Sequence, residues 1–249
     1  MSNALNQSKY MTSSIRQNKI EMLQKKADLL RTKNSFKEAI SSYLNSVLLD
    51  RNNAQSYLGL GICYKNLGKI KKAIEYLEKS ALLDNENYDT FYELGQCLLK
   101  EERSCCAIKC FIRAIQIEPD NPDAIYYLGL AHEASEEQDM ALKIYQKLIE
   151  NSPNYINAYI KKSDLLMKMQ LYKPALALYN SILKINPNFK KVYFDIGMCL
   201  DKLGRQNDAK RYYRRFLTSS PDDENANYAM KRIEKLKEIK HKITNLSLV

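Results

Sequence analysis

Apolar residues follow one template along this 249-residue chain, and the template returns every 34 positions. Within each copy the apolar side chains lie three or four residues apart, which is the spacing of one face of an α-helix. The first three clear copies contain Tyr57, Leu60, Gly61, Tyr64, Ala73, Leu77 and Ser80, then Phe91, Leu94, Gly95, Leu98, Ala107, Phe111 and Ala114, then Ile125, Leu128, Gly129, His132, Ala141, Tyr145 and Leu148. A fixed period of this size predicts an array of two-helix repeats.

Six repeats are expected in constant register, with no insertion between them. Their expected bounds are 20–53, 54–87, 88–121, 122–155, 156–189 and 190–221. The first repeat is degenerate, because Arg51 stands where later repeats close with a proline such as Pro119 or Pro153. The fifth departs from the template at Lys162 and Ser163, where a Leu-Gly pair is expected.

The two flanks differ from the repeats. Residues 1–19 are polar and lack helical periodicity, so we expect a flexible N-terminal arm, with an organelle-targeting segment as an open alternative. Residues 222–242 predict an off-pattern helix whose position for a small residue holds Lys231 or Arg232. Such a helix cannot accept a further repeat, and we expect it to be the capping helix that an array needs. Residues 243–249 are expected to form a tail.

Small residues recur where the two helices of a repeat should cross. Glycine on the first helix and alanine on the second remove side-chain bulk, so the backbones can approach closely. The aromatic residue on the second helix, such as Phe111 or Tyr213, is expected to fill the wedge toward the next repeat.

These positions resemble the tetratricopeptide repeat, a 34-residue helix–turn–helix pattern, over about four-fifths of the chain. The resemblance implies an all-α fold, a right-handed superhelical solenoid of antiparallel helix pairs. It also implies that the first helix of each pair lines a concave groove, and that such grooves bind peptides or helices of partner proteins. One subset of the family grips the C-terminal carboxylates of chaperones with Lys and Asn. The corresponding positions here hold Gln24, Asp28, Leu58 and Ile62, so that clamp is absent.

By the same resemblance, two positions on the first helix of each repeat face the groove. They are four residues apart, one turn along the same helix face. The candidate groove residues are Leu58, Ile62, Tyr92, Gln96, Tyr126, Leu130, Ile160, Asp164, Phe194 and Met198. Most are apolar or aromatic, which indicates a stripe on which an extended segment or an amphipathic helix can lay its apolar face. The alternative interpretation is that several of them only pack the first helix against its neighbours.

Charge is unevenly distributed along the chain, whose net charge is +10. Acidic residues outnumber basic ones over 87–155, whereas both ends are basic. A basic end that contacts RNA is therefore the alternative function. The groove positions hold few Lys or Arg, which argues against nucleic acid. A basic C-terminal helix could also meet the acidic middle of a second copy, so self-association stays open.

The sequence carries no motif for catalysis, phosphate binding or a metal centre. Cys63, Cys97 and Cys199 share one repeat position that should be buried, which favours small apolar residues in a reducing compartment. No apolar run is long enough to cross a membrane. We therefore expect a cytoplasmic scaffold for another protein, without enzymatic activity, cofactor or metal; organelle import stays an alternative.

Overall fold

The computed structural model describes residues 2–246, with side chains from 13 to 236. The described chain is helical and contains no β-strand. Its helices are α1 (Ser2–Thr32), α2 (Phe36–Leu49), α3 (Ala54–Asn66), α4 (Ile70–Leu83), α5 (Tyr88–Lys100), α6 (Ser104–Ile117), α7 (Pro122–Ala134), α8 (Gln138–Asn151), α9 (Ile156–Lys168), α10 (Tyr172–Ile185), the short 3-10 helix η1 (Lys190–Val192), α11 (Tyr193–Lys202), α12 (Gln206–Ser219) and α13 (Ala226–Leu246). The fold class predicted from the sequence, an all-α array of helix pairs, is confirmed.

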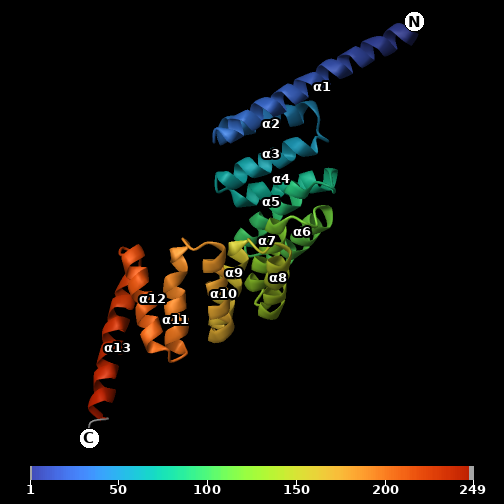
Figure 1. Ribbon diagram of the computed structural model, residues 1–249. Coiled ribbons are helices and arrows are strands. Elements are labelled where there is room, and N and C mark those ends of the chain that lie inside the picture. The colour runs from blue at the N-terminus through green and yellow to red at the C-terminus, as the bar shows by residue number, and fades with distance from the viewer. Residues whose placement is uncertain (1, 247–249) are drawn as a thin grey trace. The chain divides into compact units, whose positions relative to one another are not determined.

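The chain divides into two compact units, one ending at Glu137 and the other beginning at Gln138. In the N-terminal unit, α1 packs on α2, α3 on α4 and α5 on α6 as hairpins (Figure 1). Successive hairpins are joined by packing of α2 on α3, α4 on α5 and α6 on α7. The odd-numbered helices also touch, because α3 contacts α5 and α5 contacts α7. In the C-terminal unit, α9 pairs with α10 and α11 with α12, α8 packs on α9, and α13 packs on α12.

Each first helix ends at a corner in which one residue adopts the left-handed conformation. These residues are spaced by one repeat and are Asn34, Gly68, Glu102, Glu136, Gln170 and Gly204, with φ between 59° and 74°. A left-handed residue just past a helix terminates it and reverses the chain. Glycine adopts this conformation without penalty, whereas glutamate and glutamine are strained in it. The corner therefore comes from the repeat geometry even where the residue is unfavourable.

Glycines on the first helices lie beneath the large side chain of the second helix, as the spacing predicts. A Cβ atom on Gly95 would lie 2.7 Å from ring atoms of Phe111, and one on Gly197 would lie 2.8 Å from the Tyr213 ring. The ring thus packs against the first helix of its own repeat. Phe111 also stacks on Tyr127 of the next repeat, with ring centroids 5.6 Å apart. The Phe111 ring therefore contacts the next repeat, as predicted, but it also packs against the first helix of its own repeat.

The fifth repeat closes its helix pair in a different way. Ser163 replaces the glycine and is fully buried, and the next residue, Asp164, accepts a hydrogen bond of 2.7 Å from the Tyr179 hydroxyl. The first repeat has the same arrangement, in which the Tyr43 hydroxyl donates to Asp28. A hydrogen bond to a charged acceptor offsets the free-energy cost of removing the hydroxyl from water. In both repeats, therefore, the template glycine is replaced, and the following aspartate accepts a hydrogen bond from the buried tyrosine hydroxyl.

The cysteines predicted to be buried lie in the apolar cores. Cys63, Cys97 and Cys199 are fully buried free thiols. Burial raises the pKa of Cys63 and of Cys97 to about 11. These thiols stay protonated near neutral pH and serve as small apolar residues, as predicted.

Both flanks differ from their prediction. Residues 1–19 were expected to form a flexible arm, but α1 begins at Ser2. That segment contains no Gly or Pro to end a helix, and Ile20, at 2% exposure, anchors α1 in the core. The expected capping helix begins at Ala226 and not at residue 222, because the Asp223 carboxylate accepts the Asn225 N–H in a turn. The tail expected at 243–249 is helical through Leu246, and residues 247–249 lie outside the described chain.

Candidate partner-binding surface

Leu58, the first candidate groove residue, is buried in the core of the N-terminal unit. Its exposed fraction is 2%, and it belongs to a cluster with Leu77 of its own repeat and Leu94 of the next. A partner cannot touch Leu58 without opening that core. The interpretation that some of these residues only pack the first helix against its neighbours is the correct one at this position.

The other candidates in the N-terminal unit are half-buried. We call them the N-terminal surface; its members are Ile62, Tyr92, Gln96, Tyr126 and Leu130. Ile62 and Tyr92 pack against the core with part of the side chain still exposed. The set comes from α3, α5 and α7, which touch in succession.

A polar bridge joins α3 to α5 beside this surface. The Lys65 ammonium donates a 2.9 Å hydrogen bond to the Gln96 side-chain oxygen and forms an ion pair with Glu93. The two charged side chains are 15% and 16% exposed, so solvent screens their attraction less than at an open surface. The amide of Gln96 is thereby held in place, and a partner would meet a fixed polar group between apolar neighbours.

In the C-terminal unit, the remaining candidates are also half-buried. We call Ile160, Asp164, Phe194 and Met198 the C-terminal surface. Its three apolar members pack against the core of that unit. The Phe194 ring also meets Tyr228 of α13, with centroids 5.7 Å apart. The capping helix therefore contributes an aromatic residue to the edge of this surface.

Asp195 is a residue of this surface that the template did not single out. Burial, and then the nearby Asp164 carboxylate, raise the pKa of Asp195 to about 7. Asp195 directly follows Phe194 in the sequence, but only the fold brings it near the Asp164 carboxylate. One oxygen of Asp164 already binds Tyr179, so Asp164 has a structural role in addition to any contact with a partner.

The capping helix is fixed to the last repeat by an ion pair. The Arg232 guanidinium binds both carboxylate oxygens of Asp201, with the Nη2–Oδ1 distance 2.8 Å. The Asp201 side chain is 7% exposed and the Arg232 side chain 27%, so this bidentate pair is only partly exposed to solvent. Arg232, which was predicted to prevent a further repeat from packing on α13, thus supplies the contact that holds α13 to the last repeat.

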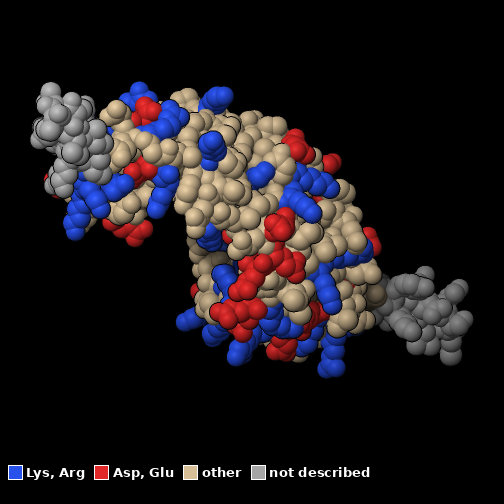
Figure 2. Space-filling model, turned by 90° about the horizontal axis from the view of Figure 1, so that it is seen from below, with Lys and Arg blue, Asp and Glu red and all other residues tan. Residues whose placement is uncertain are grey.

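The face of the molecule shown in Figure 2 mixes both signs of charge. On the face shown in Figure 2, basic and acidic side chains are interspersed among uncharged ones, although the net charge of the chain is +10. His132 is 8% exposed, and its Nδ1 lies 2.6 Å from a Glu137 oxygen, which is a local hydrogen bond. Within the described residues, no group of His, Cys, Asp and Glu side chains is arranged to hold a metal ion. No helix in the described part of the chain is both long and apolar enough to cross a bilayer.

The stacked hairpins and their half-buried first-helix surfaces define a helical-repeat protein. Sequence profiles identify the repeat: one described as tetratricopeptide repeat matches 20–53, 54–87, 156–189 and 190–223, another of the same description matches 123–155, and one described as TPR repeat matches 107–136. The first profile alone covers more than half of the chain. The protein belongs to the tetratricopeptide repeat family.

Solved structures of the same kind resemble this chain. The crystal structure of MamA is 31% identical, with a TM-score of 0.62, and the match covers 65% of this chain and 94% of MamA. YrrB, described as a TPR protein with an unusual peptide-binding site, is 26% identical, with a TM-score of 0.62 and coverage of 72% and 93%. Pseudomonas aeruginosa pilF is 16% identical over 90% of this chain and 98% of its own, with a TM-score of 0.69, which shows the fold alone. No curated protein sequence matches.

Proposed function

We propose that this protein is a non-enzymatic scaffold that binds a polypeptide segment of a partner protein on its N-terminal surface, and that its C-terminal surface is a second such site. The observation that carries the proposal is the row of half-buried apolar and aromatic side chains on α3, α5 and α7. Each of them is held by the fold and still offers part of its surface. The peptide-binding site described for YrrB supports the same function for a related array.

A partner would gain affinity from this row by covering it. Apolar area removed from water contributes about 25 cal/mol per Å², and only the surplus over the cost of association appears as affinity, so a partner must cover several of the half-exposed Ile, Leu and Tyr side chains together. The bridge of Lys65, Glu93 and Gln96 adds fixed polar groups, which discriminate among partners. Either an amphipathic helix or an extended segment meets these requirements.

The cysteine chemistry supports a reducing compartment, and we place the protein in the cytoplasm. The free thiols Cys63, Cys97 and Cys199 are packed as apolar groups. The two surfaces do not support RNA binding, the alternative function, because none of the residues that define them is Lys or Arg. Import into an organelle would need the segment before residue 20 to act as a signal.

The test is a pull-down with the full chain as bait. Tyr126→Glu with Leu130→Glu places two charges on the N-terminal surface, and we expect it to lose the proteins that the wild type captures. The matched control is Leu48→Glu with Leu82→Glu, which places two charges at apolar side chains of α2 and α4 that are 74% and 86% exposed. Circular dichroism checks that both variants keep their helices.

Two outcomes would contradict the proposal. One is a wild-type chain that captures no protein above the level of an untagged resin. The other is a folded Tyr126→Glu, Leu130→Glu variant that captures the same proteins as the control.

A further inference from the structure

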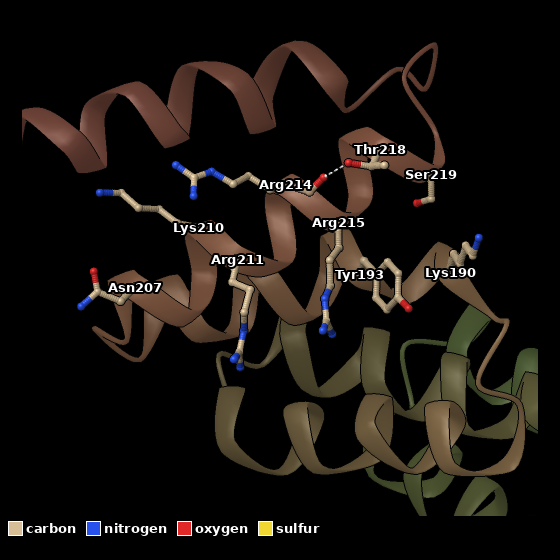
Figure 3. A pocket seen from close by; sticks show the side chains of 9 residues that line it. All are labelled: Lys190, Tyr193, Asn207, Lys210, Arg211, Arg214, Arg215, Thr218 and Ser219. Carbon is tan, nitrogen blue, oxygen red and sulfur yellow. Dashed lines mark hydrogen bonds between the residues drawn. The ribbon is translucent and has the colours of Figure 1, made fainter.

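A basic hollow lies on the C-terminal unit, along α12 (Figure 3). Its volume is about 920 Å³, within the range of ligand pockets. Five of its nine lining residues carry a positive charge: Lys190, Lys210, Arg211, Arg214 and Arg215. Among the described residues that line it, none is acidic. The hollow is separate from the two surfaces proposed to bind a polypeptide, because it is formed mainly by the second helix of its repeat.

The charges of α12 are placed unfavourably for the helix itself. Lys210 and Arg214 are four residues apart, and so are Arg211 and Arg215, so each pair brings like charges together on one side of the helix. In Figure 3 one pair points to one side of α12 and the other pair to the other side. Like-charge pairs at this spacing destabilise a helix. A bound anion would remove that repulsion.

The positions of Arg211 and Arg215 are also basic in the third and fourth repeats, as Lys109 with Arg113 and Lys143 with Lys147, but the full cluster does not recur. At the position of Lys210, the five preceding repeats hold an apolar residue: Ile40, Ile74, Ile108, Leu142 and Leu176. Lys210 extends past the helix to donate a 2.9 Å hydrogen bond to the Leu236 carbonyl of α13. The basic cluster is thus a property of the last repeat and not of the fold.

Acidic neighbours neutralise little of this charge. Asp208 lies 3.6 Å from the Arg211 guanidinium but is closer to Arg205, at 2.7 Å. Arg211 and Arg215 instead lie over the Tyr212 ring, 5.8 and 5.5 Å from its centroid. Stacking on an aromatic ring orients a guanidinium and leaves its N–H groups able to bind an anion.

We propose that this hollow binds a ligand with several phosphate groups close together. Guanidinium groups bind phosphate through two parallel hydrogen bonds, and their charge persists at any physiological pH. The cations line the hollow on both sides of α12, so a ligand that carries several anionic groups suits them better than a single carboxylate. Single-stranded nucleic acid is less favoured, because it needs successive aromatic platforms, and Tyr193 is the one aromatic residue among those that line the hollow. The phosphates come either from a soluble molecule or from a lipid headgroup.

Calorimetric titration of the full chain with inorganic tripolyphosphate at physiological salt tests the site. We expect Arg211→Gln with Arg215→Gln to weaken binding at least about tenfold, because two charge-assisted contacts are lost. The matched control is Lys143→Gln with Lys147→Gln on α8. It removes two exposed charges at the same two positions of the fourth repeat, and it should change affinity by no more than about twofold through the general field.

Vesicles then distinguish the two sources of phosphate. Co-sedimentation of wild type, but not of the Arg211, Arg215 variant, with phosphatidylcholine vesicles containing phosphatidylinositol bisphosphate identifies a lipid headgroup. Tripolyphosphate binding without co-sedimentation identifies a soluble ligand. Equal tripolyphosphate affinity in wild type and variant, or no binding by the wild type, overturns the proposal. A gel shift with single-stranded RNA that the variant abolishes, without tripolyphosphate binding, would overturn it in favour of nucleic acid.

Discussion

Replacing Gly95 by alanine tests the close crossing of α5 and α6. The new Cβ atom would lie 2.7 Å from two atoms of the Phe111 ring, whereas ordinary contacts begin near 3.4 Å. The ring cannot retreat easily, because Phe111 is fully buried and stacks on Tyr127 at 5.6 Å. The substitution must therefore push the helices apart or force the ring out of its rotamer.

The net effect is a difference between two opposing contributions. Overpacking of a filled core costs about 1–3 kcal/mol. Alanine is a better helix former than glycine by about 1 kcal/mol, which offsets part of that cost. We expect Gly95→Ala to lower the free energy of unfolding by up to about 2 kcal/mol, although the same exchange stabilises an isolated helix.

A double-mutant cycle separates the two contributions. Phe111→Val lacks the ring atoms that a Cβ on residue 95 would meet, so in that background only the gain in helix propensity should remain. Urea unfolding of the four proteins, followed by far-ultraviolet circular dichroism, gives the coupling. We expect Gly95→Ala to destabilise the wild type and to stabilise the Phe111→Val protein. Equal destabilisation in both backgrounds would refute the argument that the glycine is required by the ring.

Two further predictions concern the corners and the buried acid. Glu102→Gly should raise the free energy of unfolding by up to about 1 kcal/mol, because it relieves left-handed strain at φ 59°. The control is Glu101→Gly, at φ −94°, which should not raise it. Urea unfolding midpoints compare the two variants. The pKa of Asp195, raised to about 7 in the folded chain from about 3.9 when unfolded, means that this carboxyl destabilises the fold increasingly as pH rises from about 4 to about 7. Asp195→Asn should therefore add about 1–2 kcal/mol of stability at pH 8, allowing for solvent screening, and little at pH 4; thermal melts that show the same gain at both pH values would contradict this.

The helix pairs could be predicted because their causes lie within one repeat. Gly95 and Phe111 are 16 residues apart on the two helices of one hairpin, so their spacing alone indicates the crossing. The corner residues follow from the same register. The start of α1 could not be predicted from the period, because its first 18 residues do not belong to any repeat.

The candidate surface was harder to predict, because exposure depends on neighbouring repeats. Leu58 and Ile62 hold the two groove positions of one repeat, but Leu58 is covered through its contact with a cluster that includes Leu94 of the next repeat. The approach of Asp195 to Asp164 likewise needs the packing of two repeats. The basic cluster of α12 is visible in the sequence, but only the packing around that helix shows that its charges line a hollow.

The left-handed corners at a fixed interval have a consequence for how such a chain can change its length. Each corner restarts the next helix at the same point of the template, so removing or adding a whole 34-residue segment leaves every remaining hairpin with its own corner and its own crossing. Removing a few residues would misplace all the small side chains that follow. The protein can therefore grow or shrink in whole modules, and the length of the surface proposed to bind a partner changes in the same steps.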